Sequence, residues 1–312
     1  MDIVRKLAVC FLLLSVPQFA VAKVQEQETT EQEEQSASSQ QTTATDSVLE
    51  EREKAETKAL QNPFSISQYR PNYILPISYI KNPNPIGVTE LDFENVDNKE
   101  AKYQISMKLP VYLNDDHDSG LYVGFTAVSF WQVYNSEVSK PFRETNYEPE
   151  IFYSWQTDYR FIGIKFNQVN LGFNHQSNGQ SGLKSRSWNR LFASAVFSDE
   201  DSVYYLKTWY RIKEDEKETP TSPTGDDNPD ITNFLGHFEI GYGKKVGNFN
   251  VMTLVRNNLK SDNKGSFELN LTYPVTDRYD ITLQYFNGYG DSLIDYNRHQ
   301  QRVGLGIQLK FL

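Results

Sequence analysis

The chain has 312 residues, with 31 basic and 41 acidic side chains and a formal net charge of −10. A protein that grips nucleic acid through its phosphates presents a basic face, so this charge balance argues against such a partner. The single cysteine, Cys10, lies near the start of the chain, which excludes an intrachain disulfide and a cysteine metal site.

Residues 1–22 have the pattern of a secretory signal peptide. Arg5 and Lys6 precede an apolar stretch, and small residues follow at Ala20 and Ala22, which predicts cleavage after Ala22. The apolar stretch is shorter than the roughly 18 residues that a membrane-spanning helix needs, and no later segment reaches that length. Any crossing of a membrane is therefore expected to use β-strands.

Residues 23–61 are rich in Gln, Glu, Thr and Ser, and they include ten acidic and four basic side chains. Such a segment buries too little apolar surface to offset the entropy lost on ordering, so we predict a disordered acidic tail. One short polar helix over 46–60 is the alternative, but the composition favours a solvated spacer.

Residues 62–312 show the two-residue period of β-strands. Tyr103, Ile105 and Met107, for example, alternate with Gln104 and Ser106. The pattern recurs in about twelve segments of about ten residues, the length of a tilted transmembrane strand. These segments lie at 72–81, 101–112, 120–132, 148–157, 168–177, 187–198, 203–212, 234–243, 249–257, 265–273, 278–288 and 301–311.

The fold class that these segments predict is all-β. A soluble β-sandwich also alternates, but its strands are usually shorter. The signal peptide, the strand length and the aromatic residues near strand ends favour a transmembrane antiparallel β-barrel over 62–312 in a bacterial outer membrane. An even number of strands suits closure of such a barrel.

Polar residues interrupt the apolar face of one predicted strand. Leu171 belongs to that face, and steps of two along the strand lead to His175 and Ser177. In the next strand Asn189 shares the parity of the apolar Leu191. All three polar side chains are thus expected on the lipid-facing side of the barrel.

A hairpin around 178–186 would place Asn189 opposite His175, and Ser187 opposite Ser177. Opposed side chains are about 5 Å apart at Cβ, and residues two apart along a strand are about 6.7 Å apart, so an imidazole can bridge both gaps. A serine, a base and a group that orients the base form the arrangement used for acyl transfer. The alternative is that the three residues are polar decoration of the barrel rim.

The sequence around His175 also resembles a known family. His-Gln-Ser-Asn-Gly at 175–179, followed by Ser-Arg-Ser-Trp-Asn-Arg at 185–190, is similar to outer-membrane phospholipase A. The resemblance implies a barrel that hydrolyses phospholipid acyl esters at the outer leaflet, with phospholipase A1, A2 and lysophospholipase activity. It implies Ser177 as nucleophile, His175 as base and Asn189 as orienter of the base. Further similar blocks lie at 62–64, 136–137, 141–149, 226–231 and 288–297.

The same resemblance implies calcium. The oxyanion hole would combine the backbone N–H of Gly179 with a water on the ion. The expected ligands are the Gln180 carbonyl, Ser185 and the partner subunit's Ser139, while Asp227 belongs to a second calcium site. Oxygen ligands of this kind suit calcium.

The implied enzyme is a homodimer when active and a monomer at rest. Gly182 stands where relatives carry an acidic residue near the calcium, so a lower calcium affinity is expected here. The competing hypothesis from a different functional class is a non-enzymatic barrel, either a pore or an adhesin.

Overall fold

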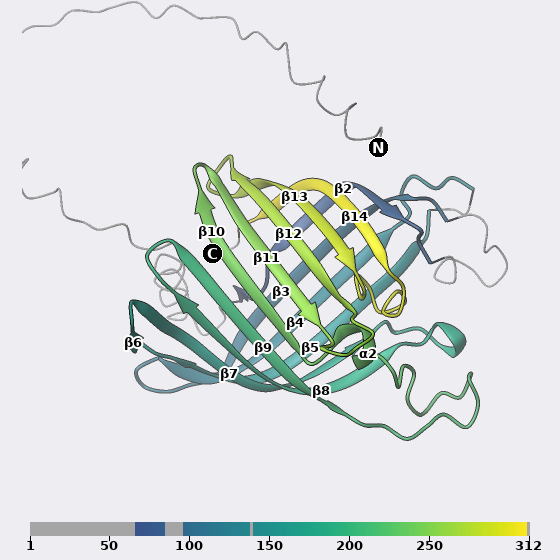
Figure 1. Ribbon diagram of the computed structural model, residues 1–312, viewed down its shortest axis with the longest axis horizontal. Helices are drawn as coiled ribbons and strands as arrows, with labels where there is room; N and C mark the ends of the chain where they lie inside the picture. Colours follow the sequence, from purple (N-terminus) through teal and green to yellow (C-terminus); the bar gives the residue numbers. More distant parts are fainter. Residues whose placement is uncertain (1–65, 85–95, 138–139, 311–312) are drawn as a thin grey trace, which may run out of the picture. The chain divides into compact units, whose positions relative to one another are not determined.

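The computed structural model describes residues 66–84, 96–137 and 140–310, so the predicted signal peptide (1–22) and acidic tail (23–61) lie outside the described residues. Within these ranges twelve long strands form one sheet, and two short strands, β1 (Ser67–Gln68) and β6 (Arg160–Phe161), pair with β3 and β7 (Figure 1). The long strands are β2 (Asn72–Lys81), β3 (Lys99–Leu113), β4 (Ser119–Trp131), β5 (Phe142–Gln156), β7 (Ile164–Ser177), β8 (Ser187–Ser198), β9 (Ser202–Ile212), β10 (Phe238–Val246), β11 (Phe249–Asn257), β12 (Gly265–Pro274), β13 (Tyr279–Gly288) and β14 (Gln300–Leu309).

The sheet closes on itself. Neighbouring strands pair antiparallel in the order β3, β2, β14, β13, β12, β11, β10, β9, β8, β7, β5 and β4. The barrel closes where β4 pairs with β3, and Ala101 there lies opposite Trp131. Closure leaves no row of unpaired backbone groups on a long strand, which is the condition for a sheet in lipid. The predicted antiparallel barrel of about twelve strands is confirmed.

The two faces of the sheet differ as in a membrane barrel. Leu171 and Leu191 point outward and are about half exposed, at 49% and 51%, whereas the neighbouring Asn174 and Arg190 are buried inside. Outer-membrane barrels have this apolar outer band and a polar interior. No helix in the described ranges is long and apolar enough to span a membrane.

Side chains fill the barrel interior. Arg143 and Arg302 are both buried, and both donate hydrogen bonds to the buried Glu100, at distances from 2.7 to 3.1 Å. An apolar cluster lies beside this network and includes Trp188, Trp209, Ile231, Leu235, Leu293 and Tyr296. Buried ions are stable only when they are paired, so these contacts fix the interior as a packed core.

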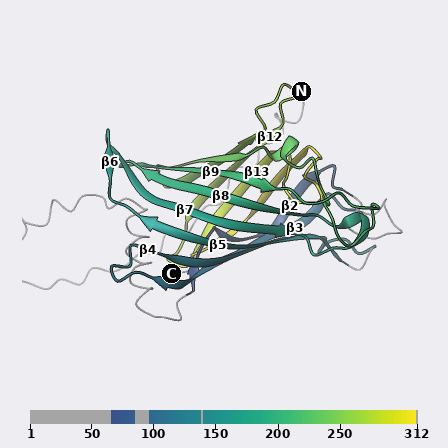
Figure 2. The ribbon, with the colours of Figure 1, turned by 90° about the horizontal axis from the view of Figure 1, so that it is seen from below.

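The connections differ in length at the two ends of the barrel. The longer ones, such as 178–186, 213–237 and 289–299, lie at the right of Figures 1 and 2, while the opposite end has turns as short as 247–248. Outer-membrane barrels have short periplasmic turns and longer extracellular loops. The long connections therefore mark the extracellular end.

Three predicted strands begin more than two residues away from where the structure has them. The segment 234–243 was expected to be a strand, but Thr232–Leu235 form the short helix α2 and the strand begins at Phe238. Ile231 and Leu235 are buried in the interior cluster. Apolar residues at this even spacing also fit the two-residue period of a strand, so the sequence alone predicts a strand here. The strands β5 and β7 begin earlier than expected, at Phe142 and Ile164, because charged residues such as Arg143 face the polar interior.

Candidate active site

The β7–β8 hairpin has the predicted register. His175 is paired with Asn189, and Ser177 is paired with Ser187, at the extracellular end of the two strands. Beyond the irregularity at Phe166–Gln168, the buried Asn170 and Asn174 of β7 alternate with outward residues as far as Ser177. The hairpin thus sets the spacing of the three candidate catalytic residues.

A hydrogen bond joins two of these residues. The Nδ1 atom of His175 lies 2.8 Å from the Oδ1 atom of Asn189. An amide oxygen only accepts, so the bond places the imidazole proton on Nδ1. The other ring nitrogen, Nε2, then carries the lone pair that a general base needs.

Ser177 follows His175 by two residues and so shares its face of β7, at a spacing of about 6.7 Å along the strand. Its partner on the other side is the outward-facing Tyr147 of β5, which is 41% exposed. Leu171 and Leu191 continue the same wall toward the middle of the membrane. The surroundings of the serine are therefore those that a lipid acyl chain would contact.

Asn178 holds the turn that follows Ser177. Its buried amide accepts a hydrogen bond from the Arg186 N–H at 2.9 Å and donates one to the Lys184 carbonyl at 2.8 Å. The next residue, Gly179, has a φ of 64°, a left-handed conformation that favours glycine. No protein acceptor for the Gly179 N–H is found in the described part of the chain, so this donor is available to a ligand.

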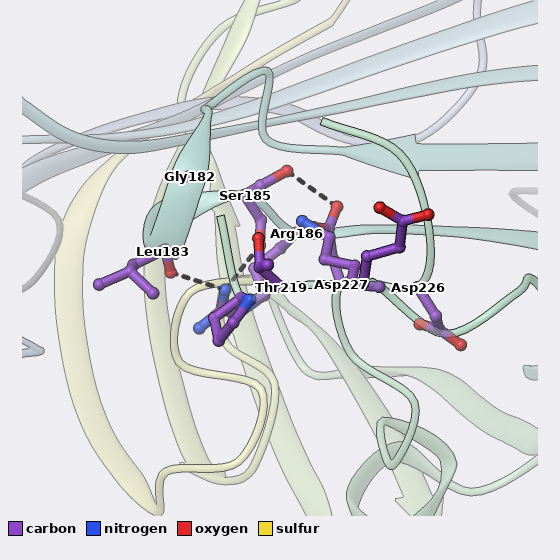
Figure 3. Close-up of a pocket in the computed structure, with 10 residues that line it drawn as sticks. Gly182, Leu183, Ser185, Arg186, Thr219, Asp226 and Asp227 are labelled. Atoms are coloured by element: carbon purple, nitrogen blue, oxygen red, sulfur yellow. Dashed lines mark hydrogen bonds and ion pairs between the residues drawn. The ribbon is translucent and has the colours of Figure 1, made fainter. Parts of the chain in front are cut away.

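The long connection between β9 and β10 brings Asp227 to the β7–β8 turn. Asp227 accepts hydrogen bonds from the hydroxyls of Ser185 at 2.8 Å, as Figure 3 shows, and of Ser187 at 3.1 Å. Lys217 of the same connection forms an ion pair with the Asp227 carboxylate. A pocket of about 360 Å³ lies between the two loops, and Ser185, Lys217 and Asp227 all line it.

The predicted calcium residues are only partly brought together. Ser185 and Asp227 are in contact, Gln180 is exposed in the same turn, and Ser139 lies outside the described residues. In the described ranges, no group of three or more His, Cys, Asp or Glu residues could hold a metal. The available donors are a carbonyl, hydroxyls and one carboxylate, which are hard oxygen ligands.

A hydrogen bond joins two of the sequence blocks noted above as similar to the family. The hydroxyl of Tyr296, from the block at 288–297, donates a 2.6 Å hydrogen bond to Asp230, from the block at 226–231. Burial and this hydrogen bond raise the pKa of Tyr296 well above its ordinary value, so the phenol stays a donor. The contact ties the loop 289–299 to the loop that carries Asp227.

One residue near the site has no counterpart among the predicted residues. Glu214 accepts a 2.9 Å hydrogen bond from the Nδ2 atom of Asn189, opposite the bond that Asn189 makes with His175. No sequence signal pointed to Glu214, because it lies two residues beyond the end of β9, where the strand period no longer fixes the side.

Comparison with known proteins gives consistent matches. The family model described as Phospholipase A1 matches residues 49–309. The phospholipase A1 of Escherichia coli strain K12 is 37% identical over 253 residues, which cover 80% of this chain and 83% of that protein. The phospholipase A1 of Proteus vulgaris is 34% identical over 253 residues, with coverage of 80% and 83%.

Solved structures agree with these relatives. Outer membrane phospholipase A from Escherichia coli has a TM-score of 0.73 and 37% sequence identity, covering 81% of this chain and 96% of that chain. The Salmonella typhi outer membrane phospholipase, solved as a dimer with bound calcium, has a TM-score of 0.72 and 37% identity, covering 80% and 93%.

Proposed function

Because this chain belongs to the phospholipase A1 family, we propose that Ser177, His175 and Asn189 hydrolyse phospholipid acyl esters on the outer wall of the barrel. The observation that carries the proposal is the 2.8 Å contact between His175 and Asn189, on the same outward face as Ser177. Polar side chains at lipid-facing positions are costly, so their presence there marks a functional site.

The geometry supports a two-step acyl transfer. The Nε2 atom of His175 takes the hydroxyl proton of Ser177 as the serine oxygen attacks the ester carbonyl, and it then returns the proton to the leaving alcohol. A water then attacks the acyl-serine: the Nε2 atom of His175 takes the water proton and returns it to the Ser177 oxygen as the fatty acid leaves. The Asn189 oxygen keeps the second imidazole proton on Nδ1 and stabilises the imidazolium ion, although less than a carboxylate would.

The Gly179 N–H is the protein donor for the developing oxyanion. It lies two residues after Ser177, and it has no protein acceptor in the described ranges. A fixed donor that stabilises negative charge in the transition state is often the largest single catalytic contribution. The left-handed backbone at Gly179 and the hydrogen bonds of Asn178 hold this donor in place.

Calcium fits the residues of the β7–β8 turn. The Ser185 hydroxyl donates its hydrogen to Asp227, which leaves its oxygen lone pairs free for a cation, and Gln180 is an exposed residue of the same turn. We assign these two residues, together with the partner subunit's Ser139, to the proposed calcium site. Bound calcium would supply positive charge and polarised water beside the oxyanion.

Asp227 fits the proposed second calcium site less well. The ammonium group of Lys217 already pairs with its carboxylate, so an ion at this position must displace the lysine. The first site is therefore the better supported of the two. Gly182, in the same turn, adds no carboxylate that would strengthen either site.

The proposed active form is a homodimer in the outer membrane, and the resting form is a monomer. The Salmonella typhi relative is a calcium-bound dimer. In this chain the site lies on the outer wall, where a second barrel can cover it, and at the long-loop end, which faces the outer leaflet. A second barrel would complete both the calcium site and a groove for the acyl chain.

The pore or adhesin hypothesis is not favoured. A pore needs a water-filled interior, whereas Glu100, Arg143 and Arg302 are buried and paired inside this barrel. Neither a pore nor an adhesin explains a histidine, a serine and an asparagine on the lipid-facing wall.

The test is hydrolysis by the mature protein refolded in detergent micelles containing phospholipid. Fatty-acid release with calcium is expected, with almost none from Ser177→Ala. Thr208→Ala, on the same outward wall of β9, serves as the matched control. A Ser177→Ala variant as active as the parent would overturn the assignment of the nucleophile, and release unaffected by a chelator would overturn the calcium site.

A further inference from the structure

We propose that Glu214 is a positioning residue of the active site, which holds the Asn189 amide in the one orientation that serves His175. The inference rests on the proposed function, because it assigns a task to Glu214 only if the triad is catalytic. It adds a carboxylate to a site in which the residue that orients the base is neutral.

Three adjacent strands carry the arrangement (Figure 1). The last residue of β9, Ile212, is paired with Asn189 of β8, and Asn189 is paired with His175 of β7. Glu214 follows Ile212 by two residues, in the connection just beyond the end of β9. Its Oε1 atom lies 2.9 Å from Asn189 Nδ2, and Asn189 Oδ1 lies 2.8 Å from His175 Nδ1.

The chemistry of the amide makes this contact important. The oxygen and nitrogen ends of an asparagine are nearly equal in size, so packing alone does not distinguish the two orientations. A reversed Asn189 would present its NH₂ group to His175 and favour the tautomer with the proton on Nε2. That tautomer cannot accept the proton of Ser177.

A carboxylate removes this ambiguity because it only accepts hydrogen bonds. Glu214 can bind the NH₂ end of Asn189 but not its oxygen, so the oxygen is held toward His175. The hydrogen bond is charge-assisted, which makes it stronger than a neutral one. The result is a chain of fixed donors and acceptors from Glu214 to His175.

The environment of Glu214 supports a specific role. The side chain is partly buried just beyond the end of β9, and no cation pairs with it among the residues described. A charge at such a position is costly unless a partner compensates. Glu216, two residues farther in the same loop, is exposed and offers a matched control.

The first readout is the split between kcat and KM in the refolded protein. Glu214→Ala is expected to lower kcat about tenfold, the size expected for loss of one charge-assisted hydrogen bond, with little change in KM. Glu214→Gln should keep most of the activity because its carbonyl can accept from Asn189, and Glu216→Ala should behave as the parent. Glu214→Asp, one methylene shorter, should lose activity as the alanine variant does.

The second readout is the tautomer of His175, which needs no turnover. Proteins with ¹⁵N-labelled histidine in micelles are compared at about pH 8.5, where imidazole is neutral, and the signal is assigned with His175→Gln. The parent should show the proton on Nδ1, and Glu214→Ala should show both tautomers. An unchanged tautomer, or an unchanged kcat in an active protein, would overturn the proposal.

The two readouts separate this proposal from the proposed function. If the parent releases no fatty acid, the phospholipase assignment fails, while the tautomer still decides whether Glu214 acts on His175 through Asn189. If Ser177→Ala abolishes activity and Glu214→Ala leaves both kcat and tautomer unchanged, the triad stands and the role of Glu214 falls.

Discussion

At the scale of single residues, the site relies on an amide where many serine hydrolases use a carboxylate. Asn189 lies beside lipid, where a buried unpaired charge is costly, and a neutral side chain avoids that cost. The weakness of an amide is that it stabilises the imidazolium ion less and can reverse its orientation. The hydrogen bond from Asn189 to Glu214 addresses the second weakness without placing a carboxylate on the histidine.

Removing the amide should therefore matter less than removing the base. Asn189→Ala is expected to lower kcat about a hundredfold, which is smaller than the ~10⁴ loss seen when the aspartate of a Ser-His-Asp triad becomes asparagine. The reason is that alanine leaves the His175 imidazole free to adopt either tautomer, whereas an asparagine in place of the aspartate holds the wrong one. The measurement is fatty-acid release at saturating substrate, and a loss as large as that of Ser177→Ala would contradict a purely orienting role.

At the scale of elements, the β7–β8 turn and the 213–237 connection have different tasks. The β7–β8 turn sets the distances within the triad, because its two strands are in fixed register. The 213–237 connection places two acidic side chains against the β7–β8 hairpin. Glu214 accepts a hydrogen bond from Asn189, and Asp227 accepts one from Ser185. Lys217 of the same loop neutralises Asp227.

The pairing of Lys217 with Asp227 predicts competition with calcium. Lys217→Ala removes the cation that an ion must displace, so calcium should bind about tenfold tighter, the size of one charged hydrogen bond. Calorimetric titration of the refolded protein measures the affinity. Lys213→Ala, an exposed lysine of the same loop, is the control. Equal affinities in the parent and Lys217→Ala would show that no calcium binds at Asp227.

At the scale of the whole molecule, the interior stabilises the barrel while the outer wall carries the chemistry. Asp291, in the connection between β13 and β14, pairs with Arg302 at 2.6 Å and Lys102 at 3.0 Å. Burial alone would raise the pKa of Asp291, but Arg302 and Lys102 outweigh it and hold the pKa well below its ordinary value. The Asp291 carboxylate therefore stays charged inside the barrel.

The lowered pKa of Asp291 predicts a loss of stability in acid. A carboxyl whose pKa is lower when folded contributes stability above its unfolded pKa, about 4, and loses it as the pH falls toward the folded value. Asp291→Asn should cost about 3 kcal/mol at pH 7, because it leaves buried cations without their partner. Denaturant unfolding in micelles measures the difference between parent and variant. That difference should shrink below about pH 4, and a difference independent of pH would refute the coupling.

Short-range features of the sequence determined the strands, the faces of their side chains and the register of the β7–β8 hairpin. Strand alternation predicted the barrel, and parity placed His175, Ser177 and Asn189 on one face, since a period of two leaves only two choices of side. The predicted opposition of His175 and Asn189 is confirmed because a nine-residue connection between in-register strands leaves little freedom. The catalytic roles of these residues remain proposals.

Only the tertiary structure decided what the long connections contribute. Period and parity end with the strand, so neither fixes where a loop as long as 213–237 folds back. The contacts of Glu214 with Asn189 and of Lys217 with Asp227 depend on that path. The paired charges inside the barrel likewise join residues far apart in the chain, such as Glu100 and Arg302, and their partners are fixed only when the sheet closes.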